Sequence, residues 1–180
     1  ISSIDVDQAL AIEGVVAILT AKDIPGVNDA SAFAHDEPLL ADERVQYIGH
    51  PIACIYATSP SLCRAAAERI EITYIPDTDP PILNVRESIK RSAFHGTPHI
   101  ISRGDVDQAI AGSTLTIRGE FDSGAQDHFY LETHAALSIP LERGRYQIYS
   151  STQHPSEVQA KVAEVLGIKR SDISIEAPRM

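Results

Sequence analysis

The stretch RYQIYSSTQHPSEVQAKVAEVLG, residues 145–167, shows how the last third of this 180-residue chain folds. Its β-rich opening, RYQIY, is typical of a strand. Pro155 suits the first position of a helix, which places His154 at the N-cap. Four apolar positions then share helical spacing: Val158, Val162, Val165 and Leu166. Gly167 ends the pattern, so the stretch predicts a strand followed directly by a helix.

The junction between that strand and helix is crowded with hydrogen-bonding residues, Ser151 to His154. A helix N-terminus offers free N–H groups and partial positive charge, and a ligand can lie in the crevice at a strand's carboxyl end. Gln153 is neutral and carries both a donor and an acceptor, so it could bridge to an oxo or hydroxo group. The simpler interpretation, which the residues alone favour, is that Ser151 and Thr152 cap the helix while Gln153 points into solvent.

The remaining pattern predicts an α+β chain. Towards the carboxyl end, STLTIRGEFDSG, AQDHFYLETHAALSIP and RYQIYSST predict three antiparallel strands, and SDISIEA predicts a last one. Nearer the start, a short helix after Asp5 or Asp7 precedes VVAILT, an apolar run that suits a strand buried on both faces. Residues 45–58 are strand-like, Ser59-Pro60 predicts a helix start, and EITYI predicts a strand. Proline-rich residues 76–98 mark a domain boundary.

Composition limits the kinds of partner. The formal charge of −10 argues against nucleic-acid binding, which clusters Lys and Arg. The longest apolar run is far shorter than a membrane span, so no membrane segment is expected. Cys54 and Cys63 lie outside any metal-type pair and are interpreted as buried thiols in a reducing compartment, which predicts a cytoplasmic protein.

Candidate chemistry within the chain is sparse. His128, Tyr130, Glu132 and His134 fall at period two, which would place them on one face of a strand. Two imidazoles and a carboxylate could bind a transition metal, but same-face neighbours lie about 7 Å apart and rarely converge on one ion. We therefore predict no metal site. Asp105 is interpreted as the N-cap of a short helix, and no catalytic residue is assigned.

Five stretches together resemble the xanthine dehydrogenase family, in particular its molybdopterin-binding large subunit as found in bacteria. They are LTAKDIPGVND, PLLADERVQYIGHPIACIYATS, RGDVDQAI, QDHFYLETHAALSIP and SSTQHPSEVQAKVAEVLGI. They occur in the family's order and cover almost the whole chain. Because the chain begins at Ile1 rather than Met, we interpret it as an internal excerpt of such a subunit.

The resemblance implies two domains and one cofactor contact. Residues 1–84 would form an α/β hammerhead-like domain without its opening strand, residues 85–102 a linker, and residues 103–180 the beginning of the molybdopterin-binding domain. In the family, the glutamine of the STQ stretch hydrogen-bonds near the molybdenum oxo group, and by motif this is Gln153. The family's catalytic glutamate lies beyond Met180, so the excerpt alone is expected to be inactive.

The resemblance also implies a reaction and partners. Hypoxanthine or xanthine would be hydroxylated to uric acid with water as the oxygen source. Electrons would pass to an iron–sulfur/FAD small subunit that carries 2Fe-2S clusters and FAD, with NAD as acceptor, in a hetero-oligomer. Two alternatives stay open: a relative that oxidises aldehydes, carbon monoxide or another heteroaromatic ring, and a non-catalytic assembly module.

Overall fold

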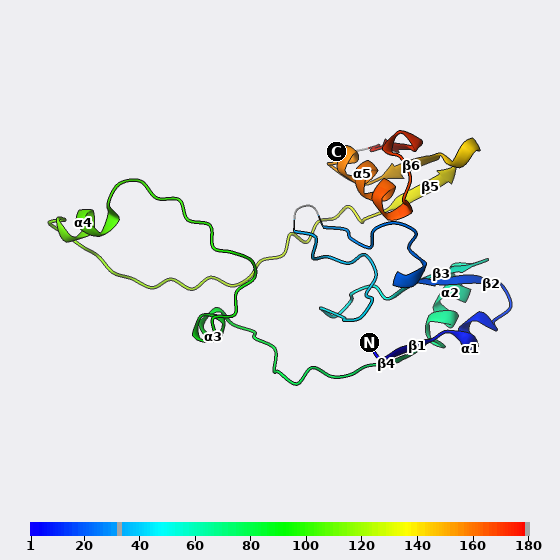
Figure 1. Ribbon diagram of the computed structural model, residues 1–180, viewed down its shortest axis with the longest axis horizontal. Coiled ribbons are helices and arrows are strands. Elements are labelled where there is room, and N and C mark those ends of the chain that lie inside the picture. Colours follow the sequence, from blue (N-terminus) through cyan, green and yellow to red (C-terminus); the bar gives the residue numbers. More distant parts are fainter. Residues whose placement is uncertain (32–33, 179–180) are drawn as a thin grey trace. The chain divides into compact units, whose positions relative to one another are not determined.

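The computed structural model describes residues 1–31 and 34–178, which mix short strands and helices (Figure 1). The strands are β1 (Ser3–Asp5), β2 (Val15–Thr20), β3 (Ala53–Ala57), β4 (Glu71–Thr73), β5 (Ala136–Pro140), β6 (Tyr146–Ser150) and β7 (Ile173–Glu176). The α-helices are α1 (Asp7–Leu10), α2 (Pro60–Ala67), α3 (Val85–Lys90), α4 (Val106–Ala111) and α5 (Pro155–Leu166). Short 3-10 turns are η1 (Ala21–Asp23), η2 (Glu142–Gly144) and η3 (Arg170–Asp172). None of the helices in the described residues has the length and apolar character that a membrane crossing requires.

The chain groups into two compact units. One consists of Ile1–Pro76 and Tyr130–Met180, and the other of Asp77–Phe129. No strand of the described residues runs through 79–84, within the proline-rich stretch. The first unit contains all the sheets of the described chain.

The amino-terminal part of the first unit contains two antiparallel ribbons, β1 with β4 and β2 with β3. Helix α2 follows β3 as the sequence predicted, because Ser59 Oγ accepts a hydrogen bond from the Leu62 amide at 3.3 Å and Pro60 begins the helix. Strands β3 and β4 flank α2 but pair in different ribbons, so they form no parallel unit.

Several predictions for this part were wrong in detail. Strand β2 pairs with β3 alone, and Val16 is 71% exposed, so β2 is not buried on both faces. Within residues 45–58 only Ala53–Ala57 forms a strand. Cys54 lies exposed on that strand and is no buried thiol. The N-cap of α1 is Val6, while Asp5 Oδ1 accepts from the Asp7 amide at 3.0 Å.

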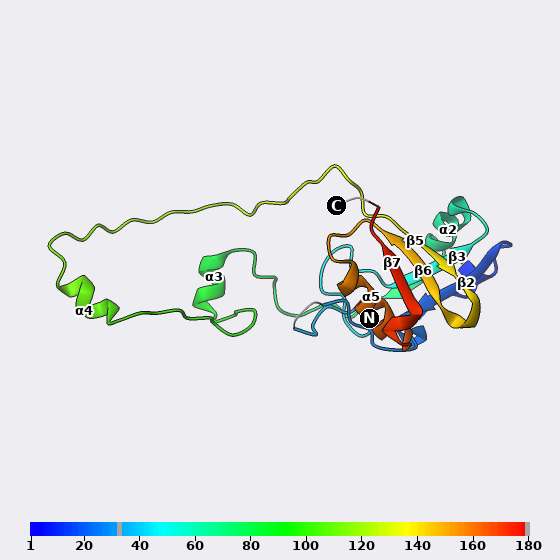
Figure 2. The ribbon, with the colours of Figure 1, turned by 90° about the horizontal axis from the view of Figure 1, so that it is seen from above.

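The carboxyl-terminal part is a three-stranded sheet in the order β5-β6-β7, shown with α5 in Figure 2. Strand β6 is antiparallel to β5 and parallel to β7, and α5 is the crossover that a parallel pair requires. Ile148, Ala163 and Ile173 form the buried core between α5 and the sheet. Gln159 Nε2 donates to the Ile173 carbonyl at 2.7 Å and so ties α5 to β7. The predicted strand, helix and strand from 145 to 177 are confirmed.

The two parts of the first unit meet at the carboxyl end of α5. The Gly26 amide donates to the Val165 carbonyl and the Val27 amide to the Glu164 carbonyl, both at 2.9 Å. Both carbonyls belong to the last turn of α5, where the Glu164 carbonyl also accepts from the Gly167 amide at 3.3 Å. Gly26 allows this close approach because an added Cβ would lie 1.9 Å from the Glu164 oxygen.

A buried carboxylate lies beside this contact. Asp29 accepts hydrogen bonds from Ser31 Oγ at 2.6 Å and from the Ser31 amide at 3.0 Å. Its other oxygen lies 2.6 Å from His35 Nδ1 and 3.8 Å from Lys161 Nζ of α5. The Ser31 bonds, with His35 and Lys161, hold the pKa of the Asp29 carboxyl well below its usual range although burial opposes the shift.

The second unit, residues 77–129, is an extended loop with two short helices (Figure 1). Asn84 and Asp105 cap α3 and α4 through bonds to the Glu87 and Gln108 amides, so the prediction for Asp105 is confirmed. The predicted strand at 113–124 is absent from the structure, and the next strand begins only at Ala136. Among the described residues no second strand pairs with 113–124, and a strand without a partner is not stable.

We expect Gly26→Ala to destabilise the 180-residue chain by about 1–3 kcal/mol, because the new methyl group overlaps the α5 carbonyls. Gly124→Ala is the matched control, since its Cβ would meet nothing within 4 Å. Urea unfolding of both variants measures the effect. Equal midpoints for the two would contradict the contact.

The lowered pKa of Asp29 predicts a pH dependence. Asp29 stays ionised to lower pH in the folded chain than in the unfolded chain. Its contribution to the free energy of unfolding is therefore fully present above about pH 5 and decreases as the pH falls further. Asp29→Asn should flatten this loss, whereas Asn at the exposed Asp42 should not. Urea midpoints at a series of pH values would measure both. Parallel curves for wild type and Asp29→Asn would rule the effect out.

Candidate functional site

The candidate site lies where β6 ends and α5 begins. Gln153 occupies this connection with an exposed side chain that makes no hydrogen bond within the described residues. The Thr152 hydroxyl accepts from the His154 amide at 3.0 Å, and His154 is the N-cap residue of α5, as predicted, without a side-chain capping bond. Helix α5 itself begins at Pro155.

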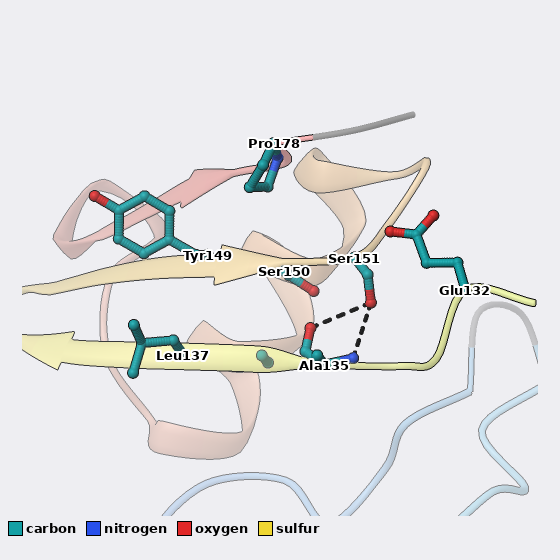
Figure 3. A pocket seen from close by; sticks show the side chains of 8 residues that line it. Glu132, Ala135, Leu137, Tyr149, Ser150, Ser151 and Pro178 are labelled. Carbon is teal, nitrogen blue, oxygen red and sulfur yellow. Dashed lines mark hydrogen bonds between the residues drawn. The ribbon is translucent and has the colours of Figure 1, made fainter.

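Ser151 joins the junction to the segment before β5 and does not cap the helix, so that part of the simpler interpretation was wrong. Ser151 Oγ accepts from the Ala135 amide at 2.9 Å and lies 3.2 Å from the Ala135 carbonyl oxygen (Figure 3). The Ser151 amide also donates to the Ala135 carbonyl at 3.0 Å. These bonds continue the β5–β6 ladder by one residue beyond the Ala136–Ser150 pair.

This ladder brings two distant sequence segments together around a pocket of about 520 Å³. Its lining residues are Tyr130, Glu132, His134, Ser151, Thr152, Gln153 and His154. The rings of Tyr130 and His134 stack with centroids 4.8 Å apart and planes 15° apart. The side chains on its walls carry polar groups, among them two imidazoles, a carboxylate and a carboxamide.

A second pocket of about 340 Å³ adjoins the first and shares Glu132 and Ser151 with it. Figure 3 shows Leu137 of β5 and Tyr149 of β6 on its walls, where the two residues are opposite partners in the sheet. Pro178 closes another side. This second pocket is mainly apolar.

The structure brings some of the residues singled out from the sequence together in the pocket and leaves others outside it. The expected strand face of His128, Tyr130, Glu132 and His134 is absent, because no described residue between Thr73 and Ala136 belongs to a strand. Three of those residues nevertheless line the Gln153 pocket, and His128 does not. No cluster of three His, Cys, Asp or Glu side chains in the described part of the chain could hold a metal ion. The role of Gln153 stays a prediction.

Sequence reasoning missed that Tyr130, Glu132 and His134 share a pocket with Gln153. The signal that could have found this is the hairpin register. Pairing of Ala136 with Ser150 makes each residue before β5 a neighbour of one after β6. A sequence motif around Gln153 cannot indicate this proximity, because the β5–β6 hairpin separates the two segments in the sequence.

Comparison with known proteins defines the family. Residues 1–78 match the model of the a/b hammerhead domain of aldehyde oxidase and xanthine dehydrogenase, and residues 92–180 match that of the molybdopterin cofactor-binding domain. The chain belongs to the aldehyde oxidase and xanthine dehydrogenase family. Within it, the chain consists of a hammerhead domain followed by part of a molybdopterin cofactor-binding domain, which confirms the predicted fold class and resemblance.

Three relatives illustrate the match. The chain is 37% identical over 180 residues to xanthine dehydrogenase of Dictyostelium discoideum and 38% identical over 181 residues to aldehyde oxidase 2 of Macaca fascicularis. Each alignment takes in 100% of this chain and 13% of the relative. The aldehyde oxidoreductase of Desulfovibrio gigas superimposes with a TM-score of 0.81 at 26% identity, covering 98% of this chain and 21% of that one. The relatives are thus much longer than the chain.

Ser151→Ala should release the segment before β5 from the junction. The Ala135 amide loses its acceptor, so we expect its hydrogen exchange to accelerate about tenfold, corresponding to roughly 1 kcal/mol for one hydrogen bond. Exchange measured by NMR on the 180-residue chain tests this. Ser156→Ala, at an exposed position of α5, is the control. Unchanged exchange at Ala135 in Ser151→Ala would show that the hydroxyl does not hold the segment.

Proposed function

We propose that the chain is part of a longer molybdenum hydroxylase that oxidises hypoxanthine or xanthine to uric acid. Electrons pass to an iron–sulfur/FAD small subunit, with 2Fe-2S clusters and FAD as carriers and NAD as acceptor, in a cytoplasmic hetero-oligomer. The observation that carries the proposal is the carboxamide of Gln153, which has no partner among the described residues and lies in a pocket with polar side chains within the molybdopterin cofactor-binding match. Xanthine dehydrogenases among the relatives support the purine substrate.

The residues present fit a molybdenum–molybdopterin group. Such a group presents oxygen and sulfur atoms that need hydrogen-bond donors, and the Gln153 Nε2 has two protons without a partner among the described residues. The neighbouring start of α5 adds partial positive charge. Gln153 would hold the cofactor by hydrogen bonding; when bound, the molybdenum supplies two-electron oxidation of the substrate carbon with oxygen from water.

The chain's own contribution is positioning. Ser151 fixes the segment that carries His134 and Glu132 against the end of β6, and this shapes the pocket beside Gln153. Gln153 is neutral, so it orients a group by hydrogen bonding and transfers no proton. We also propose the domain division predicted from the sequence, with a hammerhead-like domain at 1–84, a linker at 85–102 and a molybdopterin-binding segment at 103–180.

Aldehyde oxidation is the second candidate. It is favoured by the 38% identity to aldehyde oxidase 2 of Macaca fascicularis, similar to the identity to xanthine dehydrogenases. Steady-state kinetics of the purified full-length enzyme with xanthine, hypoxanthine and benzaldehyde would distinguish the two. We expect kcat/KM for xanthine to exceed that for benzaldehyde. The reverse order would favour the aldehyde candidate, and no oxidation of any of the three at full molybdenum loading would contradict both.

Gln153→Ala in the full-length enzyme should lower turnover about tenfold to a hundredfold. This corresponds to on the order of 1–3 kcal/mol if the lost hydrogen bond strengthens in the transition state. The melting temperature should hardly change, because Gln153 is exposed and makes no bond within the described residues.

Gln159→Ala is the matched control for this prediction. Gln159 donates to the Arg170 and Ile173 carbonyls, so its loss should lower the melting temperature instead. Turnover and melting temperature are compared at equal molybdenum content. If Gln153→Ala turns over normally, the side chain is only solvated; if it melts early, the residue is structural.

A further inference from the structure

Residues 114–122, TLTIRGEFD, alternate between apolar and polar side chains. Leu115, Ile117 and Phe121 fall on one side of an extended chain and are here called the Leu115 face. The intervening residues Thr116, Arg118 and Glu120 fall on the other side. This alternation is the pattern of a strand with one buried and one solvated face.

The structure leaves the Leu115 face in solvent. Leu115 is 76% exposed, Ile117 85% and Phe121 91%. Residues 114–122 form no strand and make no backbone hydrogen bond with other described residues. Both the apolar side chains and the backbone groups of this segment therefore lack the partners that a strand pattern requires.

A second observation concerns the polar side of the segment. Arg86 of α3 forms ion pairs with Glu120 and with Asp122, the latter at 3.2 Å. Both carboxylates lie on the polar side of the segment. The Arg86 side chain therefore contacts that side and not the Leu115 face. These exposed ion pairs place Glu120 and Asp122 beside α3 without involving the apolar residues of the segment.

We infer that residues 114–122 form a β-strand that adds to a sheet of the same polypeptide outside these 180 residues, with the Leu115 face buried there. The inference rests on the proposed function in one respect, namely that the chain is part of a longer polypeptide. Strand addition satisfies the backbone groups and buries the alternate side chains in one step.

The comparison with a solved structure indicates which polypeptide supplies the sheet that residues 114–122 would join. The superposition with the aldehyde oxidoreductase of Desulfovibrio gigas, with a TM-score of 0.81, covers 98% of this chain and so takes in nearly all of residues 77–129. That match takes up only 21% of its chain, which leaves much polypeptide to cover an extended segment. The molybdopterin cofactor-binding model also takes in residues 92–180, so the segment belongs to the domain that it would complete.

Hydrogen–deuterium exchange tests the inference. The full-length polypeptide, purified without its small subunit, is compared with the 180-residue chain at two concentrations. We expect the amides of 115–121 to exchange at least about a hundredfold more slowly in the full-length polypeptide. Protection that appears only when the small subunit is added, or that rises with concentration of the 180-residue chain, would overturn the inference in favour of those partners. Lack of protection in every sample would also overturn it.

A pair of substitutions tests the face. Ile117→Asp in the full-length polypeptide should lower the melting temperature by at least about 2–4 °C, whereas Thr116→Asp adds the same charge to the opposite side and should not. Ile117→Ala provides a milder change if the Asp variant does not fold. Equal effects of Ile117 and Thr116 substitutions would overturn the assignment. These readouts are independent of turnover, so an enzyme that does not oxidise xanthine but protects 115–121 would contradict only the proposed function.

Discussion

The antiparallel pairing of β5 with β6 places the candidate site. Ala136 lies opposite Ser150, and the Ser151 hydroxyl extends this register to Ala135. The segment before β5 must then follow the chain after β6, which brings His134 and Glu132 to the pocket of Gln153. A register slip of one residue would turn every side chain of β5 to the other face of the sheet and dismantle both pockets.

The elements that could be predicted from the sequence are those with local causes. Helix α5 has a proline at its first position and a glycine in the left-handed conformation at its end, with φ of 65° at Gly167. Helices α2 and α4 have Ser59 and Asp105 as caps. Signals of this kind act within one turn of helix, so distant parts of the chain cannot override them easily.

The predictions that were wrong depended on which strands pair with each other, and local sequence patterns do not specify this. The run of β2 is apolar enough for a doubly covered strand, yet it pairs only with β3 and exposes Val16. The alternation at 114–122 is that of a strand, but pairing requires a second strand at its edge. For the site, the motif pointed to Gln153, whereas the three pocket residues from 130 to 134 depended on hairpin register.

The contact of Gly26 and Val27 with the last turn of α5 has a consequence for biosynthesis. The amides of Gly26 and Val27 are synthesised about 140 residues before the carbonyls of Glu164 and Val165 to which they bond. The Gly26 and Val27 amides therefore have no α5 carbonyl to bond to until α5 has been synthesised and folded. The loop between α3 and α4, residues 92–104, can vary in length at little cost, since doubling a flexible loop adds only about 0.6 kcal/mol of closure entropy. Insertions in 92–104 should accordingly be tolerated during evolution far better than any change at Gly26.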